Sequence, residues 1–283
     1  APDITWHDLR YSLFSGNVFK SFWAALLSAV GNAPANQQDT QVNQGLVEGS
    51  TTNSLSDENL ALLYRHSLAS HCAGENDYTT PGGLAPIDAL LTQSAQDTLF
   101  NFNDAYHNLQ CLSALGGDVR LMTKAVGHGI DNGDSGDHCG SIERDDATFH
   151  WFEEKLYGRS GDADFIPDIC LMLGGSGEDA VVVDQVTVGG TTVAFEPQTV
   201  VTGQTGEVAP VAVSVYVADA SGNVLAGIPT LEVSVLDPIL GEGGVGDPIM
   251  LTALGQPDGQ GGYVVLQNQY RPIRGYGIHS IEM

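Results

Sequence analysis

The spacing of apolar residues changes once along the 283-residue chain, near residue 160, and this change limits the possible folds. Before it, short apolar runs at 87–94 and 118–126 alternate with helical patterns at 103–117 and 145–158. From residue 181 onward, apolar and polar residues alternate with period two in runs separated by turn signals such as SGN and PDGQGG. The first pattern predicts a parallel β-α-β unit followed by one more helix, and the second predicts an antiparallel β-sandwich. The expected fold class is therefore α/β, followed by a β-rich domain.

Composition and pattern together divide the chain into four expected segments. All three tryptophans and eight of the ten basic residues precede residue 160. The N-terminal segment has no strong strand pattern, and helices are expected over 19–30 and over 56–69, the latter with Ser56 as N-cap. The expected segments are a helical cap or insertion (1–84), the α/β part (85–158), a linker (159–180) and a β-sandwich of jelly-roll type that is expected to be incomplete (181–283).

The charge balance excludes some classes of partner. The chain has 35 acidic and 10 basic residues, of which three are lysines. Nucleic acids and anionic membranes attract basic surfaces, so neither is an expected partner. No apolar stretch approaches the ~20 residues needed to cross a bilayer, so membrane insertion is not expected either. The carboxylates are interpreted as a solubilising surface, which also fits a high-salt environment, with an acidic binding site as the alternative.

The four cysteines bear on location. Cys72, Cys111, Cys139 and Cys170 include no C-x-x-C pair, which argues against a zinc ribbon or a thioredoxin-type motif. Their even number is compatible with two disulfides in a secreted or cell-surface protein, and almost as well with four buried thiols. The sequence leaves this choice open, and we take an extracellular location as the expectation.

An acid and a histidine follow the two predicted strands of the β-α-β unit. Asp97 comes just after the first strand, and His128 follows the second strand within the sequence Gly-His-Gly. Functional groups gather at the carboxyl ends of parallel strands, which lie ~4.8 Å apart, so both side chains are expected to meet at one edge. An acid that orients an imidazole base is two thirds of a nucleophilic triad. The structural alternative is an aspartate that caps the next helix and a histidine that faces solvent.

These segments resemble a known family. LAPIDALLTQSAQDTLFNFNDAYHNLQCL, GGDVRLMTKAVGHG and TFHWFEEKLYG are similar to the last third of the α/β-hydrolase core in X-Pro dipeptidyl-peptidases and cocaine-esterase-type acyl hydrolases. ITWHDLRYSLFSG resembles the segment leading into the helical cap of that family, and NVLAGIPTLEVSV, DPIMLTAL and YVVLQNQYRPIRG resemble strands of its jelly-roll domain. The resemblance implies a partial α/β-hydrolase core, with Asp97 as triad acid, His128 as triad base and no cofactor or metal. It implies hydrolysis of small acyl esters or X-Pro peptides.

The sequence departs from the family at the nucleophile. It contains no G-x-S-x-G elbow, and Ser135 in GDSGD lies after His128, in neither the context nor the chain order of a triad serine. Three explanations are expected: a second chain or a longer, processed enzyme that brings the serine, a partial sequence, or a scaffold that has lost catalysis. The last would be a non-catalytic binding or assembly protein, with homo-oligomers formed through strand edges of the sandwich.

Other candidates have simpler interpretations. His138 is a second candidate for the base, although Gly-His-Gly directly after the strand favours His128. His66, His71 and Cys72 are close in sequence but lack a standard zinc spacing, so a structural role is expected. The aspartates of DNGDSGD miss most calcium-ligand positions of an EF-hand and are expected to form a solvated loop; they are Asp131, Asp134 and Asp137. Three aromatic residues of the cap are candidates for substrate selection or for the cap core: Trp6, Phe22 and Trp23.

Overall fold

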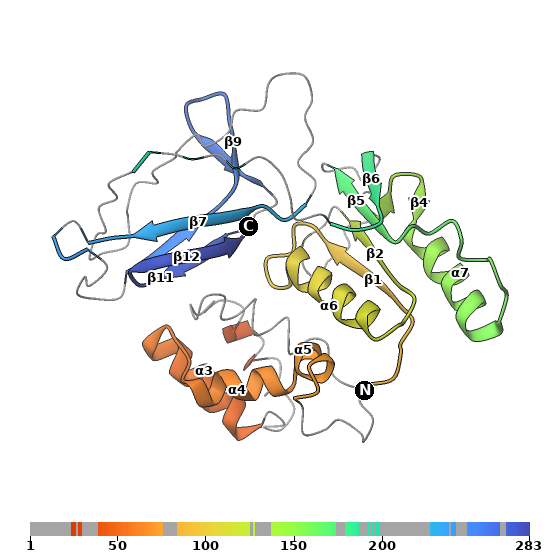
Figure 1. The fold of residues 1–283 in the computed structure, drawn as a ribbon, viewed down its shortest axis with the longest axis horizontal. Helices are drawn as coiled ribbons and strands as arrows, with labels where there is room; N and C mark the ends of the chain where they lie inside the picture. The colour runs from red at the N-terminus through yellow and green to blue at the C-terminus, as the bar shows by residue number, and fades with distance from the viewer. Residues whose placement is uncertain are drawn as a thin grey trace.

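The fold was analysed in a computed structural model, and three groups of elements are seen in it (Figure 1). Helices near the N-terminus form one group, a sheet with two helices forms the second, and antiparallel strand pairs near the C-terminus form the third. The structure describes residues 24–26, 28–29, 39–75, 84–124, 127, 137–173, 179–186, 192, 194, 196–197, 227–237, 239–241, 248–266 and 270–283.

A four-stranded sheet of order β1-β2-β5-β6 occupies the middle of the chain. β1 (Ala89–Ser94) and β2 (Val119–Lys124) are parallel and joined by α6 (Phe102–Ala114), which confirms the parallel pairing expected of the β-α-β unit. β5 (Ile169–Leu173) runs parallel to β2, and β6 (Asp179–Val183) runs antiparallel to β5. The chain is therefore mixed α/β with a mixed sheet.

The segment 159–180 is not only a linker, because it supplies an inner strand of this sheet. Four consecutive residues of β5 are buried, from Ile169 to Met172. Such an unbroken apolar run is typical of a strand covered on both faces, and it lacks the alternation that marks a half-exposed strand. β6 then continues the sheet past residue 180, into the segment assigned to the sandwich. This corrects the expected role of the segment.

Two helices cover opposite faces of the sheet. Leu121 and Ile169 pack with Ala105 and Tyr106 of α6 on one face, whereas the neighbouring residues Met122 and Cys170 pack with Trp151 on the other. Trp151 belongs to α7 (Arg144–Tyr157). Successive side chains of a strand point to opposite faces, so β2 and β5, which both have consecutive buried residues, need a helix on each side.

The helix ends follow local sequence signals. Asn101 and Asp104 form a capping box at the start of α6, and Glu143 caps α7, which ends at Gly158 in the left-handed conformation. Gly116 also has positive φ, at +91°. A Cβ on Gly117 would collide with the backbone carbonyl of Ile87, so the close approach of these two segments requires glycine.

The N-terminal part is helical. Its helices are α3 (Thr40–Thr52), α4 (Asp57–Arg65) and α5 (Leu68–Cys72), and residues 24–26 and 28–29 are helical within the predicted helix 19–30. The helix predicted over 56–69 is divided in two, because Ser67 caps a new helix by accepting a hydrogen bond from the amide of Ser70. Ser56 precedes α4 but makes no side-chain cap, since its hydroxyl donates to Glu48 instead.

The C-terminal strands pair in a nested order. β9 (Gly255–Pro257) pairs with β10 (Tyr263–Val265), β8 (Ile249–Thr252) with β11 (Arg271–Arg274), and β7 (Thr230–Val235) with β12 (Gly277–Glu282), all antiparallel. Exposure alternates along β7 and β12, as the period-two pattern predicts. The result is several small antiparallel sheets, and part of the segment for which the period-two pattern predicts strands, including 211–218, lies outside the described residues.

All four cysteines form disulfides. Cys72 of α5 is joined to Cys111 of α6, and Cys139 of the short strand β3 (His138–Cys139) is joined to Cys170 of β5. Their Cα atoms are 5.9 and 6.1 Å apart. β3 pairs with β4 (Ile142–Glu143). Two disulfides are consistent with an oxidising compartment, and within the described ranges no helix is long and apolar enough to span a membrane.

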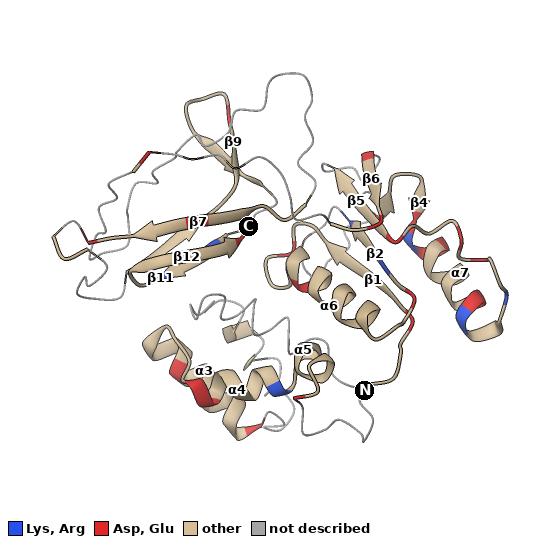
Figure 2. Cartoon of the chain, in the orientation of Figure 1, with Lys and Arg blue, Asp and Glu red and all other residues tan. Residues whose placement is uncertain are grey.

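The described charges are mainly acidic, as the composition predicts. Asp and Glu are distributed over all three groups of elements, whereas Lys and Arg are few (Figure 2). Two regions of the sheet nevertheless bring charged and polar side chains together, one at each end of its parallel strands.

Candidate active site

The carboxyl ends of β1 and β2 lie side by side, as the sequence predicts. Ser94 pairs in register with Lys124, and the amide of Ala95 donates to the carbonyl of Lys124 at 2.8 Å. A Cβ built on Gly127 would be 3.9 Å from the carbonyl oxygen of Gln96. The residues that immediately precede Asp97 and His128 are therefore neighbours across the strand ends.

Asp97 is buried at this edge, with 5% of its surface exposed. Its Oδ1 accepts hydrogen bonds from the backbone amides of Leu99 and Phe100, at 2.8 and 2.9 Å. Two amide donors on one oxygen form a turn that fixes the carboxylate orientation. The helix cap expected in the structural alternative is instead made by Asn101, four residues later.

A polar network that the sequence did not predict surrounds this turn. Gln93 of β1 donates from Nε2 to the carbonyl of Phe100 at 2.6 Å. Asn101 accepts a hydrogen bond from Nη2 of Arg271 at 2.9 Å. The N-x-x-D pattern of Asn101 and Asp104 is a recognisable capping-box signal. Arg271 has no such signal, because it is 170 residues away in sequence.

His128 lies outside the described residues, and so do four other candidates: Asp131, Asp134 and Ser135 of the following segment, and Trp6 of the cap. Phe22 and Trp23 are likewise outside. The described chain resumes at Asp137, whose carboxylate pairs with Arg144 at 2.9 Å and whose carbonyl accepts from the Arg144 amide at 3.0 Å. The segment that contains His128 is thus anchored at β2 before it and at Asp137 after it.

His138, the second candidate base, is on β3. It pairs with Glu143 of β4, and the next residue is bonded to β5 through the Cys139–Cys170 disulfide. β3 also lies beside β2. His138 is therefore held in a small hairpin that is fixed to the sheet.

The predicted structural role of His66, His71 and Cys72 is supported. Cys72 is in a disulfide, so its sulfur is not a thiolate ligand. His71 is buried, and burial followed by the nearby His66 lowers its pKa. Within the part of the chain that the structure describes, no group of three or more His, Cys, Asp or Glu could hold a metal ion.

Comparisons with known proteins place this chain in no family. A scan against protein-family models and a search of curated proteins each found no match. The geometry of the chain and its sequence motifs therefore carry the functional argument.

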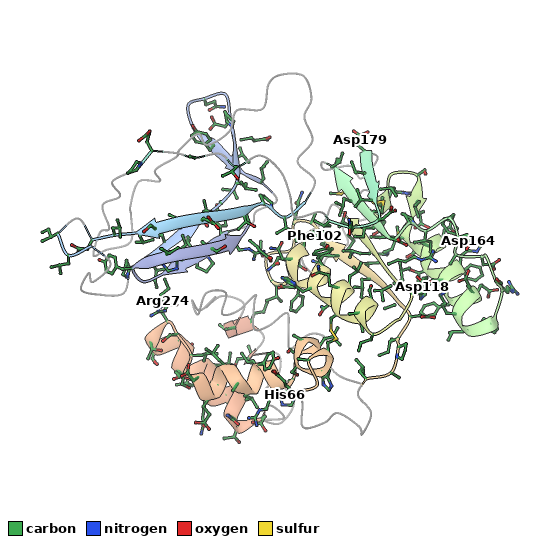
Figure 3. All side chains as sticks on the ribbon, in the orientation of Figure 1. His66, Phe102, Asp118, Asp164, Asp179 and Arg274 are labelled. Carbon is green, nitrogen blue, oxygen red and sulfur yellow. A yellow bond between two sulfur atoms is a disulfide. The ribbon has the colours of Figure 1, made fainter. Side chains whose placement is uncertain are left out.

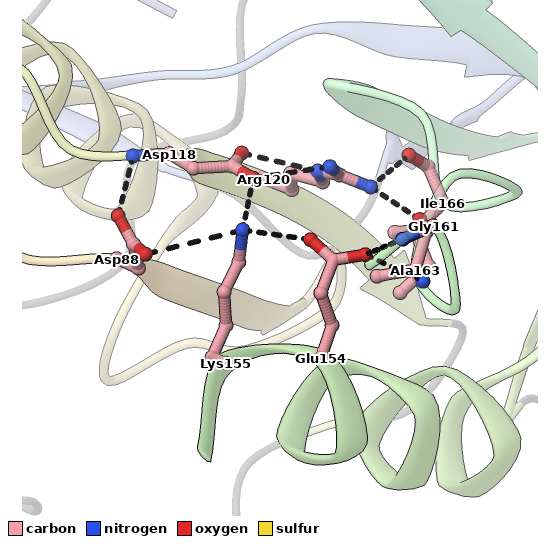
Figure 4. Close-up of polar contacts among 8 residues, drawn as sticks. All are labelled: Asp88, Asp118, Arg120, Glu154, Lys155, Gly161, Ala163 and Ile166. Atoms are coloured by element: carbon pink, nitrogen blue, oxygen red, sulfur yellow. Dashed lines mark hydrogen bonds and ion pairs between the residues drawn. The ribbon is translucent and has the colours of Figure 1, made fainter. Parts of the chain in front are cut away.

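The opposite, amino end of the sheet holds a network of ion pairs (Figure 4). Lys155 of α7 contacts Asp118 at 2.7 Å and Glu154 at 2.9 Å, and Arg120 contacts Asp118 at 3.1 Å. Arg120 also donates to the carbonyls of Ala163 and Ile166, the latter at 2.7 Å.

The pKa values at this end reflect mutual pairing. Burial raises the pKa of Asp118, but hydrogen bonds from Arg120 and then Lys155 together lower it by more than burial raises it. The net shift of this pKa is downward. The hydrogen bond to Asp118 raises the pKa of Lys155. An amide hydrogen bond from Ala163, followed by Lys155, lowers the pKa of Glu154. Each shift favours the charged form, which is the pattern of a stabilising network.

Proposed function

We propose that this chain carries the acid and the base of a serine hydrolase site, of the type found in X-Pro dipeptidyl-peptidases and acyl esterases. The single observation that carries the proposal is the buried, oriented Asp97 at the carboxyl end of β1, with Gly127 beside Gln96 across the strand ends. This position would leave His128, the next residue after Gly127, near the acid. Ligand sites of open α/β sheets lie at the carboxyl ends of their strands.

The proposed mechanism needs a serine from outside the given sequence, because the sequence contains no G-x-S-x-G. The serine Oγ attacks the carbonyl carbon of an ester or X-Pro amide, and His128 takes the hydroxyl proton. His128 then gives this proton to the leaving alcohol or amine as the acyl-enzyme forms, and activates water in the second half. Asp97 holds the imidazole tautomer and stabilises the imidazolium.

The C-terminal strands support the family assignment in the proposal. Their pairs, β7 with β12, β8 with β11 and β9 with β10, are nested around one hairpin. Nested antiparallel pairing of this kind is compatible with a jelly-roll domain like that of the family. The helices α3 to α5 precede the sheet, as the cap of that family does.

Labelling of the native purified material with a fluorophosphonate tests the proposal. We expect a serine of a partner chain or of a longer native chain to be labelled, and we expect His128→Ala to abolish the labelling. His138→Ala is the matched control, since it changes a nearby histidine that the proposal leaves outside the mechanism. Labelling that survives His128→Ala would remove His128 from the mechanism, and absence of labelling in the wild type would count against a serine hydrolase.

A second candidate, binding or assembly without catalysis, is favoured by the outer face of α7. Phe149, Phe152 and Leu156 are spaced along one face of the helix and are 58, 50 and 72% exposed. Adjacent exposed apolar side chains on a helix mark contact surfaces. Sedimentation velocity would detect self-association, and a complex that Phe152→Ser dissociates would support this candidate. A monomer at all concentrations would contradict self-assembly.

A further inference from the structure

Arg271 is a buried cation that joins the C-terminal strands to the candidate site. It is the first residue of β11 and is 7% exposed. Its Nε donates to the backbone carbonyl of Glu282 at 3.0 Å, and its Nη2 donates to Oδ1 of Asn101 at 2.9 Å. Burial lowers the pKa of Arg271, while the nearby carboxylates of Asp104 and Glu282 raise it. A buried guanidinium needs such partners, because burial removes its water.

Asn101 receives this hydrogen bond with its amide orientation fixed. Its Oδ1 also accepts from the Asp104 amide at 3.3 Å, so two donors face the oxygen. A flipped side-chain amide would put the NH₂ group of Asn101 against both donors. The atom that faces the two donors is therefore the oxygen, Oδ1. Nδ2 of Asn101 is buried and has no hydrogen-bond partner among the described residues. Asn101 is therefore held at this position by its acceptor oxygen.

A short path of hydrogen bonds leads from Asn101 to the acid. The preceding residue, Phe100, donates its amide to Oδ1 of Asp97 and accepts at its carbonyl from Gln93. The turn 97–101 is thus held at one side by β1, through Gln93, and at the other side by β11, through Arg271. Phe102, just after the turn, is at the end of α6 that is nearest to the C-terminal strands (Figure 3).

We propose that Arg271 is a positioning residue for Asp97: by holding Asn101 it fixes the turn that orients the Asp97 carboxylate. This inference rests on the proposed function, and it makes the C-terminal strands a support of the site. The role is indirect, since Arg271 acts through Asn101 and the turn, and it contacts no reacting atom in the proposed mechanism.

The chain offers a matched control in Arg274, on the same strand. Its Nη1 donates to the backbone carbonyl of Asn53, just after α3, at 2.7 Å. Arg274 therefore links β11 to the N-terminal helices. Figure 3 shows it beside α3. Replacing either arginine by lysine keeps the positive charge on β11, but the hydrogen bond to Asn101 comes from Arg271.

Hydrogen exchange at the amides of Leu99 and Phe100 tests the proposal in the native assembly. We expect Arg271→Lys, which cannot bridge both oxygens, to increase exchange at these two amides by about tenfold, while Arg274→Lys leaves it unchanged. Asn101→Ser is a second variant, because serine still caps α6 but is too short to reach Arg271, and it should have the same effect. Unchanged exchange in both Arg271→Lys and Asn101→Ser would overturn the proposal.

Kinetics separate this inference from the proposed function. In the complete enzyme, Arg271→Lys should lower kcat by about tenfold with little change in KM, and it should shift the lower limb of the pH profile, whereas Arg274→Lys should change neither. A wild-type assembly without hydrolase activity would overturn the proposed function, although the exchange data would still report on the turn. Faster exchange with unchanged kcat and pH profile would overturn the positioning role alone.

Discussion

The two ends of one sheet use polar residues in different ways. At the amino end, Asp118, Arg120, Glu154 and Lys155 pair with one another, and Arg120 also donates to carbonyls of the connection between α7 and β5. At the carboxyl end, Asp97 accepts hydrogen bonds from backbone amides, and its turn depends on an arginine from the C-terminal strands. Opposite charges in direct contact stabilise each other, and each pKa shift in the amino-end network favours the charged form. The amino end is therefore a stabilising network, whereas the carboxyl end holds the acid of the proposed site.

The largest expected effect is that of Asp97→Asn at the carboxyl end, which is compared with Asp118→Asn at the amino end. Asp97→Asn keeps an acceptor for the amides of Leu99 and Phe100, so the free energy of unfolding should change by less than about 1 kcal/mol. Hydrolysis by the complete enzyme should fall about 10⁴-fold, because a neutral amide favours the wrong imidazole tautomer. Urea unfolding and steady-state kinetics measure the two effects.

Asp118→Asn should give the opposite result. It removes the anion that pairs with Arg120 and Lys155, whose side chains are 12 and 20% exposed, so it should reduce the free energy of unfolding by about 1.5–3 kcal/mol. Hydrolysis should be unchanged. If Asp118→Asn lowered kcat as much as Asp97→Asn, the functional difference between the two ends of the sheet would be disproved.

The disulfides provide a second, smaller comparison. They close loops of similar length, with sequence separations of 31 and 39 residues, so removing either pair by double replacement with serine should cost about 3–4 kcal/mol. Only Cys139→Ser with Cys170→Ser should also reduce hydrolysis, since Cys139 anchors the chain after the segment that contains His128. Equal activity losses for the two pairs would indicate a general effect of destabilisation.

The smallest expected effect is the acid sensitivity of the amino end. The pKa values of Asp118 and Glu154 lie below their ordinary values of 3.8 and 4.5. Because these carboxyls have a lower pKa when folded, their contribution is complete above the ordinary values and is lost as the pH falls through the folded ones. We expect the free energy of unfolding to decrease below about pH 4.5, and to decrease less in Asp118→Asn. Urea unfolding at a series of pH values measures this difference.

The sequence predicted the elements around the site because their signals are local. The two parallel strands, α6 and α7 were found from apolar spacing and glycine stops, and the boundaries agree to within a few residues. Asp97 was singled out because an acid after a buried strand is visible in the sequence. β5 was missed because its short apolar run, Ile169–Leu173, lies between Asp- and Gly-rich stretches and was assigned with them to a linker, whereas its pairing with β2 shows it to be a strand.

The sequence by itself determined the acidic surface, the β-α-β unit and the placement of Asp97 at a strand end, because composition and short-range periodicity fix these features. The tertiary structure decided how the cysteines pair, how the C-terminal strands are nested and which residue holds the Asp97 turn. Each of these depends on groups that are far apart in sequence: Arg271 and Asn101 are separated by 170 residues. Such contacts form only when burial of the apolar faces brings the segments together, and no local pattern records them.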